Sequence, residues 1–269
     1  MPELPECEVG RKIAEAACVG KTIEYVYAAE DDIVYDGVSP RSFARTLKGR
    51  KVEAVHRRGK QLWMTLDQPP HALFHFGMTG SFRAYTDESE RHKYCKCELL
   101  MGDGTRLGMK NSRRLGRIRL REDPENEPPI RDLGFDPYLE MPGVKTFTRL
   151  LTQRKAPVKA VLLDQGFAAG VGNWIADESL YQARIDPRRR ANTLSEKEAR
   201  TLRTKLRYVI RKSVEWDADA RRYPDSWLFP HRWQLRASKK GDIRDHEGHR
   251  VTFDKVGGRT TSWVPARQR

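Results

Sequence analysis

The sequence predicts an α+β protein whose first half is built mainly from strands and whose second half is built mainly from helices. Before residue 121, apolar residues alternate with polar ones in several short runs, as they do in half-buried strands. From about residue 147 they recur every three or four residues, as on the buried face of a helix. An acidic, proline-containing stretch, Arg121–Pro129, lies between the two patterns and predicts a domain boundary near residue 132.

The first domain, residues 1–132, is expected to begin with a helix over its first 20 residues or so. Pro5 suits a first helical turn, and apolar residues then repeat at a spacing of four. Alternating runs predict strands near 22–28, 62–66, 94–99 and 118–120, which form antiparallel sheets packed face to face. Arg57–Lys60 predicts a tight basic turn between two of them, eased by Gly59.

A helical domain is expected over residues 133–230, and a short hairpin with a tail over residues 231–269. Ser195 and Glu198 have the spacing of a capping box and predict the start of a long helix. The helical pattern stops at about Trp233. Two alternating runs joined by Gly257-Gly258 then predict a β-hairpin.

Charge points to a polyanionic partner, because Lys and Arg number 51 against 37 Asp and Glu, a formal net charge of +14. An apolar content of 38% rules out global disorder. No apolar run approaches the ~18 residues of a membrane span, and the N-terminus lacks the apolar stretch of a signal peptide. Four cysteines in 269 residues do not form a disulfide scaffold, which favours an intracellular protein.

The N-terminus carries the most specific chemistry. Removal of Met1 before the small residue Pro2 would leave a free secondary amine, which can attack a sugar C1′ and form an iminium ion. An α-amino group has a reference pKa of about 7.7–8.0, so part of it is neutral near pH 7. The adjacent Glu3 can move protons at the sugar or the base. The alternative is that Pro2 and Glu3 simply begin a helix.

The run Pro2-Glu3-Leu4-Pro5-Glu6 resembles the opening of the formamidopyrimidine-DNA glycosylase/endonuclease VIII family. These bifunctional enzymes of base excision repair remove oxidised bases and cut the strand at the resulting abasic site. The resemblance implies a DNA-formamidopyrimidine glycosylase with DNA-(apurinic or apyrimidinic site) lyase activity, in which Pro2 forms a Schiff base and β,δ-elimination follows. Glu3 would relay protons.

Further segments resemble the family in the expected order. Gly59–Trp63 resembles the turn whose lysine, here Lys60, holds a phosphate beside the lesion; the alternative is a solvated lysine. Phe76–Gly80 resembles the loop whose methionine, here Met78, enters the gap left by a flipped base; the alternative is a core methionine.

Asn111–Gly116 resembles the loop that supplies the two other void-filling residues. The resemblance implies that Arg113 faces the estranged base and that Leu115 wedges the stack. The sequence departs from the bacterial pattern here, because Asn111-Ser112 replaces Asp-Pro and Leu115 replaces Phe. Opposite-base preference therefore stays open.

Lys155–Pro187 closely resembles the family's helix–two-turn–helix (H2TH) motif. Gly172 lets the backbone approach a phosphate, and Asn173 is expected to begin the second helix, where an amide and a helix N-terminus can meet an anion. The alternative is an ordinary helical hairpin. The motif also occurs in nucleic-acid binders that are not glycosylases.

The C-terminus cannot form the four-cysteine zinc finger usual in the family. The cysteines all lie in the first domain, and His246 and His249 are only two further potential ligands. We therefore expect neither a metal nor another cofactor. Gly257–Pro265 nevertheless resembles the tip of the finger, so Arg259 would grip phosphate on a zincless hairpin, unless it is merely solvated. This pattern resembles the plant and fungal branch.

The segment Trp216–Trp227 looks shorter than the bacterial loop that closes over 8-oxoguanine. The resemblance thus implies activity on formamidopyrimidines, hydantoins and abasic sites in double-stranded DNA, and weak activity on 8-oxoguanine. The protein is expected to be a monomer, nuclear if eukaryotic and otherwise cytoplasmic. The alternative function is a non-catalytic lesion- or RNA-binding protein on the same scaffold.

Overall fold

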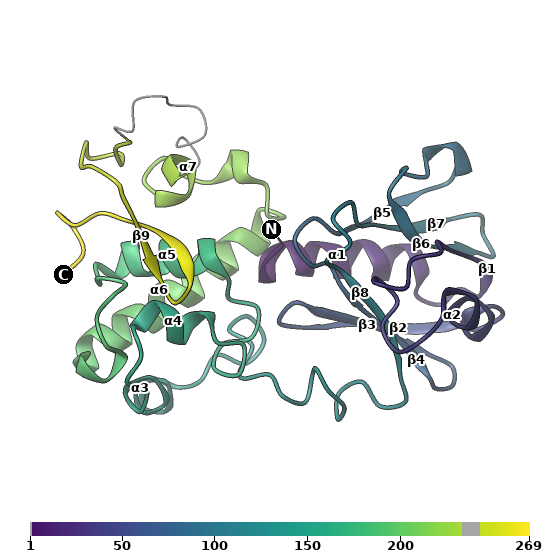
Figure 1. Cartoon of the computed structure of the whole chain (residues 1–269), viewed down its shortest axis with the longest axis horizontal. Helices are drawn as coiled ribbons and strands as arrows, with labels where there is room; N and C mark the ends of the chain where they lie inside the picture. Colours follow the sequence, from purple (N-terminus) through teal and green to yellow (C-terminus); the bar gives the residue numbers. More distant parts are fainter. Residues whose placement is uncertain (1, 233–242) are drawn as a thin grey trace. The chain divides into compact units, whose positions relative to one another are not determined.

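The structure is a computed structural model that describes residues 2–232 and 243–269. The chain forms two compact units, Met1–Asp132 and Leu133–Arg269 (Figure 1). No helix in the described ranges is both long and apolar enough to cross a membrane.

The first unit is a β-sandwich of two four-stranded antiparallel sheets, which confirms the predicted face-to-face arrangement. One sheet has the order β1-β6-β7-β5, with β1 at Ile23–Ala28, β6 at Cys95–Met101, β7 at Arg106–Lys110 and β5 at Ser81–Tyr85. The other has the order β2-β3-β4-β8, with β2 at Val52–Arg58, β3 at Gln61–Leu66, β4 at His71–His75 and β8 at Arg117–Arg121.

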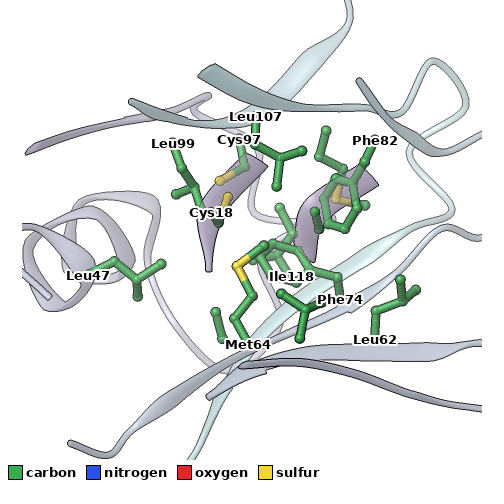
Figure 2. Packing of buried hydrophobic residues seen from close by; sticks show 14 of the residues in the cluster. Cys18, Leu47, Leu62, Met64, Phe74, Phe82, Cys97, Leu99, Leu107 and Ile118 are labelled. Atoms are coloured by element: carbon green, nitrogen blue, oxygen red, sulfur yellow. The ribbon is translucent and has the colours of Figure 1, made fainter. Parts of the chain in front are cut away.

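The core of this unit lies between the sheets. In Figure 2, Cys97 and Leu107 extend from one sheet towards Met64 and Phe74 on the other. All four side chains are at most 2% exposed. Each fully buried side chain of the size of Met or Phe contributes roughly 1.5–3 kcal/mol relative to its exposed form, so packing between the sheets stabilises this unit.

Helix α1 (Leu4–Cys18) packs against strands β2 and β5, and the shorter helix α2 (Pro40–Leu47) packs against β1. Pro5 stands in the first turn of α1, as the sequence predicts. The backbone N–H of Glu3, the residue before the helix, donates to the Glu6 carboxylate at 2.9 Å. Because this bond closes the helix end, it fixes the chain that leads to Pro2.

The second unit is helical, as predicted, with α3 (Val144–Thr152), α4 (Val158–Leu163), α5 (Asn173–Ala183), α6 (Glu196–Glu215) and α7 (Leu228–Arg232). The short helix α7 was not predicted individually. Helix α6 begins with the predicted capping box between Ser195 and Glu198. Its apolar stripe is completely buried and comprises Leu202, Leu206, Val209 and Ile210.

The predicted hairpin consists of β9 (Thr252–Val256) and β10 (Arg259–Trp263). Gly257 and Gly258 form its two-residue turn with φ of +59° and +74°, the left-handed conformation that a type I′ turn requires at both positions. Val264, which follows the hairpin, packs with Tyr181 of α5. The predicted boundary at residues 230/231 stays a prediction, and the predicted end of the helical pattern at Trp233 lies outside the described residues.

Candidate active site and nucleic-acid interface

The start of α1 gathers two carboxyl groups beside Pro2. Glu3 is buried, with 1% of its surface exposed, in an extended conformation just before the helix. Burial and the nearby Glu3 carboxylate raise the pKa of Glu6 to about 7. Near neutral pH the Glu6 carboxyl group is therefore only partly ionised, and a carboxyl group in this state suits general acid–base chemistry. The chemistry expected from the sequence at this end of the chain involved Pro2 and Glu3, not Glu6.

The turn that carries Lys60 is fastened to α1. Gly59 has a φ of +57° in the tight turn between β2 and β3. The buried Arg57 guanidinium donates from Nε to Glu8 of α1 at 2.8 Å and from Nη1 to the Gly59 carbonyl at 3.0 Å. The structure therefore brings Lys60 to the helix that begins next to Pro2 and Glu3.

His75 lies close to this turn and its cations. Its strand neighbour in β3 is Gln61, the residue after Lys60. Burial, and repulsion from Lys60 and Arg119, lower the pKa of His75 to about 4. Its Nδ1 accepts the Gly77 N–H at 3.3 Å, so the neutral ring carries its proton on Nε2 and can donate there. Sequence reasoning missed His75, since a lone histidine in a strand has no distinguishing pattern.

Met78 and the loop that carries Arg113 and Leu115 form one exposed group. Met78 is 37% and Leu115 41% exposed, so Met78 is not a core residue. A Cβ at Gly77, whose φ is +61°, would lie 2.3 Å from the Leu115 carbonyl oxygen. Only glycine permits this approach of the two loops.

Asn111 holds the two loops together. Its side chain is completely buried; Nδ2 donates to the Phe76 carbonyl at 2.9 Å and Oδ1 accepts the Gly116 N–H at 3.1 Å. Aspartate at this position could accept from Gly116 but could not donate to Phe76. The departure from the bacterial pattern thus has a structural role that the sequence did not reveal.

In the second unit, the turn between α4 and α5 is braced by one side chain. Gln165 donates to the carbonyls of Leu163 and Val171, both at 2.9 Å, and accepts the Gly170 N–H at 3.0 Å. Gly172 is the residue before α5, and α5 begins at Asn173, as predicted. The helix dipole favours an anion at this end.

Asn173 bonds the hairpin at Thr260, the residue after Arg259. Asn173 Nδ2 donates to the Thr260 carbonyl at 2.8 Å, next to the exposed Arg259. The Asn173 amide nitrogen, which the sequence assigned to an anion, is therefore engaged within the protein in this structure. The buried Lys159 also reaches this strand, with Nζ 2.7 Å from Thr261 Oγ1.

A buried ion-pair network anchors the hairpin to the helices. Asp177 of α5 pairs with Lys159 of α4 at 2.6 Å and with Arg232 of α7 at 2.8 Å. It also accepts the backbone N–H of Ser262 in β10 at 3.1 Å. Sequence reasoning missed this network, because a lysine inside the apolar stripe of a six-residue helix gives no sign of a partner.

The described residues offer one cluster of three potential metal ligands, Asp245, Glu247 and His249. The Asp245 carboxylate already accepts bonds from Tyr181, from Glu247 N and from His249 N. Glu247 contacts Arg267. Carboxylates committed in this way do not fit a resident zinc ion. The four cysteines all belong to the first unit.

A sequence model of the formamidopyrimidine-DNA glycosylase N-terminal domain matches residues 1–118, and one of the formamidopyrimidine-DNA glycosylase H2TH domain matches residues 133–225. The chain belongs to the formamidopyrimidine-DNA glycosylase family. Members are bifunctional glycosylase/lyases of base excision repair. The predicted family and fold are therefore confirmed.

Individual members of the family match this chain over most of its length. The Arabidopsis thaliana formamidopyrimidine-DNA glycosylase is 39% identical over 282 residues, covering 100% of this chain and 71% of that protein. The Bacillus subtilis enzyme is 31% identical and covers 97% and 96%. The solved Lactococcus lactis FPG mutant in complex with Fapy-dG-containing DNA has a TM-score of 0.85 at 26% identity, with 100% of both chains covered.

Proposed function

We propose that this glycosylase/lyase excises formamidopyrimidines and hydantoins, and 8-oxoguanine only weakly, through a Schiff base on Pro2. The observation that carries the proposal is the pair of carboxyl groups, Glu3 and Glu6, held at the helix start beside Pro2. A protein that only binds DNA has no need of an N-terminal secondary amine next to an acid.

The reaction begins once Met1 has been removed and the Pro2 nitrogen is a free amine. The nitrogen attacks C1′, and the bond from C1′ to the base breaks. Glu3 relays protons for the departure of the base and for the opening of the sugar to an iminium ion. Loss of a proton from C2′ then expels the 3′ phosphate, and a second elimination expels the 5′ phosphate. The iminium ion takes up the electrons in each step.

The remaining site residues hold DNA in this scheme. Lys60, Asn173 and Arg259 bind phosphates of the damaged strand, with Gly172 giving the backbone of the H2TH turn its close approach. Met78, Arg113 and Leu115 fill the space left by the flipped nucleotide, which offsets part of the few kcal/mol that flipping costs. The exposed position of Met78 and Leu115 supports this assignment.

The partner we propose is double-stranded DNA with an oxidised base or an abasic site, bound by a monomer. The solved relatives in complex with abasic-site and Fapy-dG DNA support this partner. The 39% identity to the Arabidopsis enzyme, and the absence of cysteines from the described part of the hairpin region, support the plant and fungal branch with a zincless finger. We accordingly propose a nuclear location.

Borohydride trapping tests the proposed chemistry. Processed protein should form a covalent complex with an abasic-site duplex, because reduction fixes the iminium ion. It should not form one with a tetrahydrofuran analogue, which has no C1′ carbonyl to condense with the amine. Tight binding to both duplexes without trapping would instead support a non-catalytic lesion- or RNA-binding protein.

Lesion choice follows from the segment Trp216–Trp227. Tyr223 and Trp227 are 6% and 3% exposed and their rings lie 5.1 Å apart, so these aromatic side chains are committed to packing within the second unit. A base held with few added contacts has little to offset its unstacking, and planar 8-oxoguanine stacks better than ring-opened or non-planar lesions.

Single-turnover excision from matched duplexes opposite cytosine should be fast for formamidopyrimidine and slow for 8-oxoguanine. Equal rates would contradict the assignment.

A further inference from the structure

The loop between β7 and β8 contains a strained residue. Arg114 stands between Arg113 and Leu115 and has a φ of +55°. A residue with a Cβ seldom adopts this left-handed conformation and does so at a cost in free energy. Surrounding contacts must therefore hold Arg114 in place.

Those contacts come from a buried carboxylate in the segment after β1. Asp31 is 5% exposed and accepts from Arg114 Nε at 3.1 and 3.0 Å and from Nη2 at 3.0 Å. Lys96 of β6 contacts the same carboxylate at 2.7 Å. Although burial acts to raise it, the bonds from Arg114 and Lys96 hold the pKa of Asp31 below its ordinary value. The carboxylate is therefore charged and held on two sides.

The loop is thus fixed at two points, and these have different consequences. Asn111 joins the base of the loop to the backbone next to Met78. The pair of Asp31 and Arg114 instead fixes the backbone at the residue between the two exposed side chains. Adjacent residues share the dihedral angles of Arg114, so a change there redirects Arg113 and Leu115 together.

We infer that Asp31 is a positioning residue for base selection: through Arg114 it fixes the directions in which Arg113 and Leu115 meet the estranged base and the stack. The inference rests on the proposed roles of these two residues. It assigns to a buried acid, which acts through Arg114, a part in discriminating the base opposite the lesion.

The test compares Asp31→Ala with Asp36→Ala. Asp36 lies in the same connection between β1 and α2, and its replacement removes an exposed ion pair with Arg119 at 2.6 Å. Single-turnover excision of formamidopyrimidine is measured opposite each of the four bases. Asp31→Ala should shrink the ratio of fastest to slowest rate by about tenfold, equivalent to ~1.4 kcal/mol. Asp36→Ala should leave the ratio unchanged. Equal slowing opposite all four bases would overturn the inference, since it indicates only a loss of folded protein.

A second pair of variants tests the route through Arg114. In the Asp31→Ala background, Arg114→Gly should retain a larger ratio of fastest to slowest excision rate than Arg114→Ala. Glycine adopts a positive φ readily, whereas alanine does so only at a cost in free energy. Equal discrimination in the two would contradict the role of backbone strain. Borohydride trapping on a preformed abasic site should persist in every variant. If the wild type itself could not be trapped, that result would contradict the proposed function rather than the role of Asp31.

Discussion

Replacing Pro2 and replacing Glu3 should separate the two half-reactions. Pro2→Gly should lower borohydride trapping on abasic DNA by on the order of 10²-fold, because the glycine amine lacks the ring that orients the nitrogen. Glu3→Gln should slow excision of an intact damaged base by about 10²–10⁴-fold, the usual contribution of a positioned acid or base. Cleavage of a preformed abasic site needs mainly the amine, so Glu3→Gln should change it far less.

Glu15→Gln is the matched control, since Glu15 lies on the same helix and pairs with Arg11 at 2.7 Å. Its excision and trapping should equal those of the wild type. Protein that retains Met1 should also fail to trap, because the Pro2 nitrogen is then an amide. Full activity in that form, or equal losses of both half-reactions in Glu3→Gln, would refute the assignment.

Removing the Lys159 charge should destabilise the second unit by about 3–5 kcal/mol, the usual cost of breaking a buried ion pair. The change Lys159→Met keeps much of the volume but removes one of the two cations, Lys159 and Arg232, that pair with the buried Asp177. For a unit of this size the loss lowers the melting temperature by roughly 10–20 °C. Strand cleavage should fall too, since Lys159 holds the strand that carries Arg259.

Calorimetry on the wild type, the single variants and the double variant checks this expectation. Lys197→Met changes an exposed lysine of α6 and should shift stability by less than about 0.5 kcal/mol. The double change Lys159→Met with Asp177→Asn should cost less than the sum of the single changes, because the uncompensated charge is gone. A chelator should leave the wild-type melting temperature unchanged. A large chelator effect would show that metal, rather than the ion pairs, holds the hairpin.

Local rules accounted for much of the fold. The proline in the first turn of α1, the capping box before α6 and the glycine pair at 257–258 each act within four residues of the chain, so the sequence alone revealed them. The chemistry of a free secondary amine identified Pro2 as a candidate, and the family resemblance added Lys60, Asn173 and Arg259. Their catalytic and DNA-binding roles stay predictions.

The residues that escaped prediction act across long separations. Asn111 was recognised only as a departure from a pattern, although it bonds a residue 35 positions away. Lys159 bonds Thr261, 102 positions away, and Asp31 bonds Arg114, 83 positions away. A polar residue in such a place has no local requirement that a short sequence pattern could report, because its partner is chosen by the tertiary fold.

The link from Glu8 through Arg57 to the Gly59 carbonyl has a consequence for the order of events on DNA. Both ends of this link lie in the first unit: Glu8 is six residues from Pro2, and Gly59 is next to Lys60. The spacing between Pro2, the proposed nucleophile, and Lys60, the proposed phosphate ligand, is therefore set when the unit folds. In the proposed mechanism, a damaged nucleotide therefore reacts only if the distance between its C1′ and its phosphate matches this fixed spacing.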